Sequence, residues 1–214
     1  MPQPKNLYES TLDKNPIIGI VRGITPERVV GIAEVMMAAG IKVIEVPLNS
    51  PDALKSIELL AKNFDNELLC GAGTVTTTQQ VNDVQNAGGQ LIVSPNCNPA
   101  VIKSCIDENL ICIPGIATAS EAFCAIESGA RRLKLFPAQT YGPGHLGALR
   151  AVLPADIKIY PVGGIDEGNT DTWLNAGASG FGFGSSLYQM NDSVRQVQVR
   201  ALALCKSMGK FYEA

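Results

Sequence analysis

The stretch that decides the fold is residues 42–64, which read KVIEVPLNSPDALKSIELLAKNF. Its first seven residues are mostly apolar, and residues 51–64 carry apolar side chains at the spacing of a helix. A strand followed directly by a helix is the repeating unit of folds that contain a parallel sheet. The stretch therefore predicts one strand–helix unit.

The same unit recurs along the chain. Short apolar runs occupy residues 17–22, 42–48, 68–73, 90–95, 111–115, 132–137, 157–164 and 180–184. Helical patterns cover residues 26–40, 51–64, 77–89, 98–109, 118–130, 144–154, 169–177 and 192–209. The repetition favours one α/β domain over residues 1–214, a (β/α)₈ TIM barrel, and leaves an open doubly wound sheet as the alternative. Residues 1–15, with Tyr8 and Leu12, predict a short extra helix over the barrel's bottom.

Composition narrows the possible partners and location. The net charge of −3 argues against a nucleic-acid partner, and the charged fraction of 17% is a weak sign of oligomerisation. No apolar run has the length of a membrane span, and no cationic start precedes an apolar run, so neither a membrane segment nor a signal peptide is predicted. We expect a cytoplasmic protein.

The cysteines and the one histidine argue against a metal site. None of the six cysteines lies in a CxxC pair, and the single histidine is His145. Zinc sites need clusters of such residues, so we expect no metal and no other cofactor. Most of the cysteines lie in apolar segments, which favours reduced, buried thiols and a reducing compartment.

The first candidate for chemistry is Lys134. Functional side chains of a barrel come from the carboxyl ends of its strands. In residues 132–137, Leu133 and Leu135 share one face, which leaves Lys134 and Phe136 pointing into the barrel. Burial lowers the pKa of an amine, and a neutral amine can attack a ketone. Lys134 is therefore a candidate for a Schiff base, with a structural ion pair as the alternative.

Two further charged residues share the inward face. Glu45 alternates with the outward residues Ile44 and Val46, and a buried carboxylate there suits a general acid or base. Arg22 ends the first strand, where a guanidinium suits a carboxylate or phosphate group. Structural pairing among Glu45, Arg22 and Lys134 is the alternative interpretation.

Other polar and special residues lie on the same predicted face. Asn49 follows the second strand, and Pro95 ends the fourth. Thr74 follows Gly71-Ala72-Gly73, where its hydroxyl either binds a substrate carboxylate or satisfies the turn.

Glycine-rich turns after the last two strands predict a phosphate site. Glycine lets backbone N–H groups approach an anion closely, and the loops after strands seven and eight hold phosphate in many barrels. The residues concerned are Gly163 and Gly164 after Val162, and Gly184 and Ser185 after the eighth strand.

Seven short motifs in this chain together resemble those of a known enzyme family. In order they are IVRG (20–23), EVPLNSP (45–51), GAGTV (71–75), SPN (94–96), PGIAT (114–118), LKLFPA (133–138) and VGGI (162–165). Together they resemble the 2-keto-3-deoxy-6-phospho-sugar acid aldolases (KDPG and KDPGal aldolases), from about residue 16 to residue 190. The resemblance implies metal-free enzymes that are usually homotrimers and that cleave their substrate to pyruvate and a triose phosphate.

The resemblance also implies roles for individual residues. Lys134 would form the imine with the substrate's C2 ketone, and Glu45 would be the proton shuttle. Thr74 and Arg22 would hold the pyruvyl end. The phosphate would lie against the residues of the two glycine turns, Gly163, Gly164, Gly184 and Ser185. Phe136 and Pro95 are expected to contact substrate beside them.

Two positions indicate the branch of the family. The 6-phosphogluconate branch tends to carry arginine where this chain has Asn49 and threonine where it has Val162. The chain therefore resembles the 6-phosphogalactonate branch, with a 6-phosphogluconate or 4-hydroxy-2-oxoglutarate aldolase as the alternative. A metal-dependent sugar-phosphate epimerase also stays open, as does a non-catalytic sugar-phosphate-binding barrel, which would leave Lys134 and Glu45 without a task.

Overall fold

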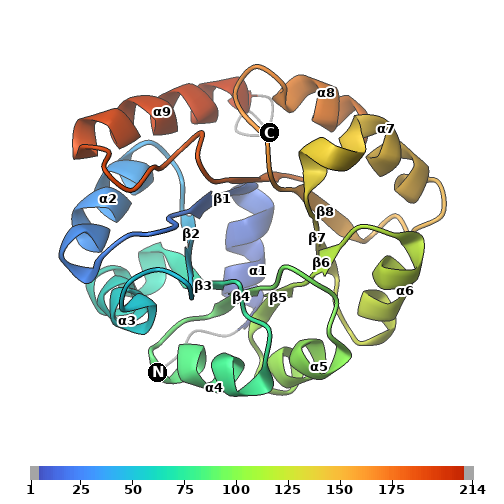
Figure 1. Ribbon diagram of the computed structural model, residues 1–214, viewed down its shortest axis with the longest axis horizontal. Helices are drawn as coiled ribbons and strands as arrows, with labels where there is room; N and C mark the ends of the chain where they lie inside the picture. The colour runs from blue at the N-terminus through green and yellow to red at the C-terminus, as the bar shows by residue number, and fades with distance from the viewer. Residues whose placement is uncertain (1–4, 210–214) are drawn as a thin grey trace.

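The computed structural model describes residues 5–209, and side chains from residue 10 onward. Strands alternate with helices through this range (Figure 1). The strands are β1 Ile17–Ile20, β2 Val43–Pro47, β3 Leu69–Gly73, β4 Leu91–Val93, β5 Ile111–Ile113, β6 Gly115–Ile116, β7 Arg132–Leu135, β8 Lys158–Pro161 and β9 Phe181–Phe183. The helices are α1 Lys5–Lys14, α2 Pro26–Ala38, α3 Ala53–Phe64, the 3₁₀ turn η1 Asp65–Glu67, α4 Thr78–Asn86, α5 Pro99–Asp107, α6 Ala119–Glu127, α7 Ala138–Arg150, α8 Thr170–Asn175 and α9 Val194–Ser207.

The strands form a parallel barrel. Six pair in the order β5-β4-β3-β2-β1-β9, and three pair in the order β6-β7-β8. A parallel bridge between Val162 and Gly182 joins the end of β8 to β9, while β5 and β6 follow one another along the chain. Helices α2 to α9 lie in a ring around the strands, whereas α1 lies in the middle of the view, as Figure 1 shows. The predicted (β/α)₈ barrel is confirmed, and the open sheet is wrong because β1 pairs with both β2 and β9.

The fifth predicted strand, residues 111–115, is divided at Pro114 into β5 and β6. Proline has no N–H group, so it cannot donate to a neighbouring strand. Its carbonyl oxygen still accepts a hydrogen bond from the Lys134 N–H at 2.8 Å. The division thus falls where the ladder loses a donor, and it leaves β7 anchored to this part of the barrel.

Helix α7 begins at Ala138, six residues before the predicted start at residue 144. Its φ of 76° and ψ of 167° at Gly142 interrupt the helix, and Pro143 follows directly. Proline is favoured in the first turn of a helix, so the second part matches the predicted segment. The first part was missed because Gly142 and Pro143 disfavour a continuous helix.

Three helices begin with a capping box, in which the side chains of the N-cap and N3 residues each accept from the other's backbone N–H. This motif fixes where the chain turns from the strand-side loop into the helix. The pairs are Thr77–Gln80, Thr118–Glu121 and Ser193–Gln196.

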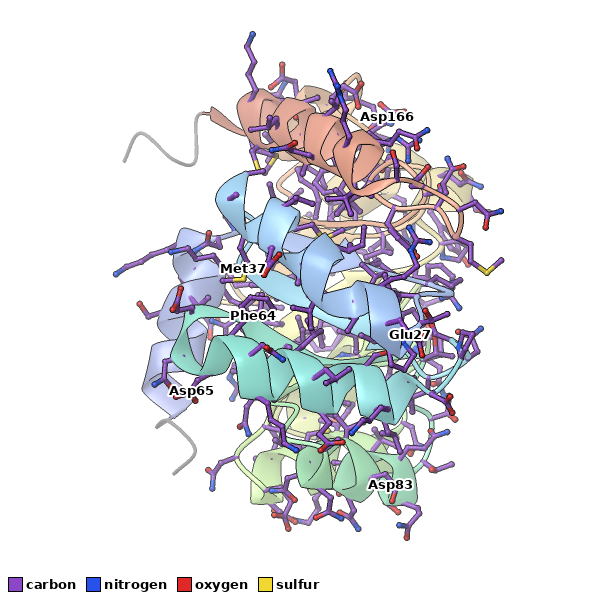
Figure 2. All side chains as sticks on the ribbon, turned by 90° about the vertical axis from the view of Figure 1, so that its left-hand side faces the viewer. Glu27, Met37, Phe64, Asp65, Asp83 and Asp166 are labelled. Carbon is purple, nitrogen blue, oxygen red and sulfur yellow. The ribbon has the colours of Figure 1, made fainter. Side chains whose placement is uncertain are left out.

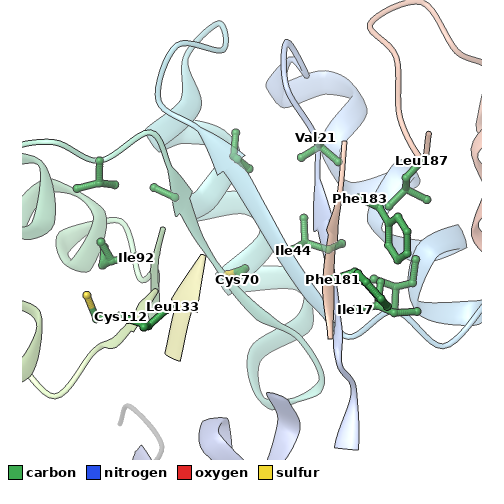
Figure 3. Close-up of a cluster of buried hydrophobic side chains, with 14 of the residues drawn as sticks. Ile17, Val21, Ile44, Cys70, Ile92, Cys112, Leu133, Phe181, Phe183 and Leu187 are labelled. Atoms are coloured by element: carbon green, nitrogen blue, oxygen red, sulfur yellow. The ribbon is translucent and has the colours of Figure 1, made fainter. Parts of the chain in front are cut away.

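The core has two parts. Figure 3 shows the larger, which includes Ile44, Cys70 and Leu133 and fills the space between the strands and the helices. The smaller fills the lower barrel interior and consists of Leu12, Ile18, Val43, Leu69, Leu91, Val93, Ile111, Ile113 and Tyr160.

Helix α1 closes the bottom of the barrel. Its Leu12 is fully buried among the interior side chains, and its Asp13 forms a 3.0 Å ion pair with Arg132 of β7. Figure 2 shows α1 on the side of Met37 and Asp65, away from Glu27 at the start of α2. The predicted extra helix is confirmed, while the Tyr8 side chain lies outside the described residues. No helix in residues 5–209 is both long and apolar enough to cross a lipid bilayer.

Candidate active site

A cavity of about 160 Å³ opens at the carboxyl ends of β1, β2, β7, β8 and β9. This is the end of the barrel that carries function in folds of this type. The cavity brings together nine of the predicted site residues: Arg22, Glu45, Lys134, Phe136, Val162, Gly163, Gly164, Gly184 and Ser185.

Lys134 lies on β7 with its side chain inside the barrel. Leu133 and Leu135 on either side of it belong to the outer core, as the alternation predicts. Its Nζ atom lies 4.7 Å from the centre of the Phe136 ring, and only 6% of the residue is exposed. Burial lowers the pKa of the Lys134 amine, a nearby Glu45 carboxylate raises it, and the Arg22 cation lowers it. The net result is an amine that loses its proton more readily than an exposed lysine.

Glu45 reaches the same cavity from β2 and is 1% exposed. Burial raises its pKa to about 7, against the opposing effect of the Lys134 and Arg22 cations. Its Oε2 atom is buried and has no hydrogen-bond partner among the described residues. The carboxyl group therefore exchanges its proton near neutral pH, where a general acid–base residue works best.

Two glycines leave the space that the side chains of Glu45 and Val162 occupy. A Cβ atom at Gly73 would lie 1.9 Å from Oε2 of Glu45, and one at Gly182 would lie 2.7 Å from Cγ2 of Val162. Both distances are far below van der Waals contact, so any side chain at either position would displace its neighbour. Gly73 of β3 thus leaves space for the Glu45 carboxylate inside the barrel. This role was not predicted from the sequence.

The two glycine-rich loops also line the cavity and meet there. Gly163 and Gly164 have φ values of 100° and 73°, which strain residues that carry a Cβ. The hydroxyl of Ser186 donates to the carbonyl oxygen of Ile165 at 2.7 Å and ties the loops together. The backbone N–H groups of the two glycines, Ser185 and Ser186 have no acceptor among residues 5–209. Unpaired N–H groups from two loops suit an anion such as phosphate.

Four further residues line this cavity that were not predicted as site residues. Ser186 ends the glycine-rich turn that predicts the phosphate site, but only Gly184 and Ser185 of that turn were assigned to phosphate. The others carry no polar side chain that would mark them: Ile20, Ile165 and Gly182.

Three predicted site residues lie at the same end of the barrel but do not line the cavity. Asn49 is exposed and accepts a hydrogen bond from Nη1 of Arg22 at 2.5 Å. Thr74, after β3, has a φ of 61°, which is strained for a β-branched residue. Pro95, after β4, packs against Gly115, where a Cβ would lie 2.4 Å from the Pro95 carbonyl carbon.

The described residues contain no group of three histidine, cysteine or acidic side chains that could hold a metal ion. Nε2 of His145 lies 2.6 Å from the carbonyl oxygen of Ala117, and its ring stacks on Tyr141 at 4.9 Å. Cys70 and Cys105 are buried, and burial raises the pKa of the Cys70 thiol to about 12. The side chains that metals prefer are thus dispersed, and metal independence stays a prediction.

Known proteins are similar to this chain over most of its length. The family model described as KDPG and KHG aldolase matches residues 8–202. The 2-dehydro-3-deoxy-6-phosphogalactonate aldolase of Escherichia coli K12 is 41% identical over 194 residues, which make up 91% of this chain and 95% of the relative. The KHG/KDPG aldolase of the same organism is 32% identical over 172 residues, or 79% of each chain.

A solved structure is similar to this chain in fold as well. A native KDPGal structure superposes with a TM-score of 0.90 at 40% identity, covering 93% of this chain and 97% of the other. The matches in sequence and in structure both extend over almost the whole length of the chain. The chain therefore belongs to the KDPG and KHG aldolase family and is an aldolase, a carbon–carbon lyase.

Proposed function

We propose that this protein is a class I aldolase that cleaves 2-dehydro-3-deoxy-6-phosphogalactonate to pyruvate and D-glyceraldehyde 3-phosphate. The observation that carries the proposal is the placement of a buried amine and a buried carboxyl group, Lys134 and Glu45, in one cavity that two glycine-rich loops also line. The greater similarity to the galactonate aldolase than to the KHG/KDPG aldolase supports the choice of substrate.

The reaction begins at Lys134. Its neutral amine attacks the C2 carbonyl carbon of the substrate and gives a carbinolamine. Loss of the carbinolamine hydroxyl as water, with a proton from Glu45, leaves a protonated imine. The lowered pKa of Lys134 supports this step, because a larger share of the amine is neutral at physiological pH.

The protonated imine then accepts electrons from the bond that breaks. The Glu45 carboxylate takes the proton of the C4 hydroxyl, directly or through a water molecule. The C4 oxygen forms the aldehyde carbonyl, the C3–C4 bond breaks, and its electron pair gives an enamine while glyceraldehyde 3-phosphate leaves. Protonation at C3 and hydrolysis of the imine release pyruvate and the amine. The pKa of Glu45, about 7, supports its use as base and then as acid.

The pyruvyl end of the substrate is held near Arg22. We assign the carboxylate to the Arg22 guanidinium and the Thr74 hydroxyl, since both groups donate hydrogen bonds to anions. Asn49 supports this assignment through its hydrogen bond to Arg22. Phe136 and Pro95 supply apolar contacts beside the reacting carbons.

The phosphate end is assigned to the two glycine-rich loops that line the cavity. The N–H groups of these loops that have no acceptor among residues 5–209 support this assignment. Backbone N–H groups can bind an anion without a buried, positively charged side chain. The residues concerned are Gly163, Gly164, Gly184 and Ser185.

The configuration at C4 decides between the two branches of the family. We assign the preference for the galacto epimer to Asn49 and Val162. The test is the rate on the two C4-epimeric 2-dehydro-3-deoxy-6-phospho acids. We expect kcat/KM for the galactonate epimer to be higher by about 10-fold or more, a ratio typical of discrimination by pocket contacts. Equal rates, or a preference for the gluconate epimer, would favour the alternative aldolase.

We also propose a homotrimer in a reducing cytoplasm. Large apolar side chains are exposed on several outer helices, among them Phe123 of α6 at 41% and Leu202 of α9 at 52%, and such side chains favour association. Light scattering on the purified protein should give a mass about three times 22.6 kDa. A mass equal to that of one chain would contradict the trimer.

A further inference from the structure

The loop of residues 184–193 joins β9 to α9, and its first residues line the cavity. Its far end is held by Arg28 in the first turn of α2. The Arg28 side chain donates from Nη1 to the carbonyl oxygen of Met190 at 2.5 Å and from Nη2 to that of Asp192. One guanidinium thus binds two carbonyl groups of the loop, each at least 162 residues away in the sequence.

A buried carboxylate within the loop, that of Asp192, ties the same end of the loop to Arg200 of α9. Asp192 is 6% exposed, and its Oδ2 atom accepts from the Gln189 N–H at 2.7 Å. Both terminal nitrogens of Arg200 donate to the carboxylate, with Nη2 at 3.2 Å from Oδ1. A buried charge that loses its partner is strongly destabilised, so the arrangement resists deformation.

These contacts continue to the cavity. The side chain of Gln189 donates from Nε2 to the carbonyl oxygen of Ser185 at 3.2 Å. Ser186, next in the chain, donates to Ile165 of the other glycine-rich loop. Met190 covers Gly23, where a Cβ would lie 2.8 Å from its Cγ and Sδ atoms. The network therefore runs from the ion pair between the buried Asp192 and the half-buried Arg200 to the residues that present their N–H groups to the cavity.

We propose that Arg28, Asp192 and Arg200 are positioning residues for recognition of the substrate phosphate. None of them lines the cavity, and they act by holding the loop of residues 184–193 in its binding conformation. A loop that is already ordered loses less conformational entropy when a ligand binds, so its affinity is higher. The inference rests on the proposed function, because it requires a phosphorylated substrate.

The test compares Arg28→Met with the wild-type enzyme on two substrates, 2-dehydro-3-deoxy-6-phosphogalactonate and the same 2-dehydro-3-deoxy acid without its phosphate. We expect KM for the phosphorylated acid to rise about 10-fold, with kcat within about twofold, since two charge-assisted hydrogen bonds are lost. The kcat/KM on the unphosphorylated acid should change less than about twofold, because that substrate makes no use of the loop. Arg28→Lys keeps the charge and should recover part of the KM.

Arg195→Met is the matched control, because Arg195 is an exposed arginine on α9, and it should leave both substrates unaffected. Asp192→Asn is the second variant and should reproduce the selective rise in KM. An equal loss on both substrates, or an unchanged KM for the phosphorylated acid, would overturn the positioning role. Failure of the wild-type enzyme to cleave either acid would instead overturn the proposed function itself.

Discussion

The two halves of the barrel interior differ in kind. Strand β2 contributes to both, since Val43 near its start packs against Leu12, Leu69 and Tyr160, whereas Glu45, two residues later, enters the cavity. Burying a side chain such as Val43 contributes about 1.5–3 kcal/mol to stability. Burying Glu45 does the opposite when the group is charged, as its raised pKa indicates. One strand thus stabilises the fold at its start and places a costly buried carboxyl group at its end.

The largest expected effect is on turnover in the upper half. Glu45→Gln keeps the shape of the side chain but cannot accept a proton. Because general acid–base catalysis contributes about 10²–10⁴-fold, we expect kcat to fall by that factor. KM should change far less, since the phosphate loops and Arg22 still hold the ends of the substrate. Steady-state kinetics on the phosphorylated acid measure both quantities.

The matched control for that variant is Glu58→Gln on α3, whose carboxylate pairs with Lys55 and Lys62 on the outer surface. It should leave kcat unchanged. A Glu45→Gln enzyme with near-normal kcat would show that Glu45 is only a structural partner of Lys134.

The second effect is on stability in the lower half. Leu12 is fully buried, and truncation of such a leucine to alanine typically lowers the free energy of unfolding by about 2–5 kcal/mol. We expect Leu12→Ala to lose that amount in urea denaturation while kcat per folded molecule stays unchanged. Val152→Ala, at a site just after α7 that is 57% exposed, should change stability by about 0.5 kcal/mol or less. A large fall in kcat for Leu12→Ala would contradict the account that the lower half serves stability and the upper half serves turnover.

The third effect is a pH dependence of stability that Glu45 introduces. Its pKa is about 7 in the folded chain against 4.5 for an ordinary glutamate, so between these values the folded chain binds more protons than the unfolded chain. The free energy of unfolding is therefore unaffected by this shift below pH 4.5, and it falls as pH rises from 4.5 through about 7. Above that pH the loss amounts to up to about 3 kcal/mol.

This pH dependence is measured by urea denaturation of wild type and Glu45→Gln at several pH values. The glutamine variant should gain stability relative to wild type as pH rises from 4.5 to 7. A difference that is constant with pH would mean that the carboxyl group titrates normally.

The smallest expected effect is that of metal removal. The described residues hold no cluster suited to a metal ion, and the proposed chemistry needs none. Activity should therefore survive prolonged treatment with EDTA unchanged. Loss of activity that a divalent cation restores would contradict the metal-free mechanism.

Most of the fold could be predicted because each strand and helix has its own local pattern. The exceptions have local causes: Pro114 divides one strand, and Gly142 hides the beginning of α7. The number of strand–helix units favours a closed barrel, but the register of its strands could not be predicted from such patterns. Register depends on pairings between distant residues, such as the bridge between Val162 and Gly182.

The site was predictable where alternation along a strand decides which side chains point inward. That argument placed Lys134 and Glu45 correctly in the cavity, while the roles assigned to them stay predictions. It could not separate cavity residues from their neighbours, so Thr74 and Asn49 were included although they do not line it. The contacts of Arg28 join segments far apart in the chain and leave no local signal.

The central claim is that Lys134 forms a covalent imine, and trapping with borohydride tests it most directly. The protein is incubated with pyruvate, reduced, digested and mapped by mass spectrometry, with Lys158 of β8 as an internal comparison because it is exposed. We expect one reduced pyruvyl adduct, located on Lys134, since burial favours the neutral amine there. An adduct on another lysine, or no adduct at all, would contradict the Schiff-base mechanism.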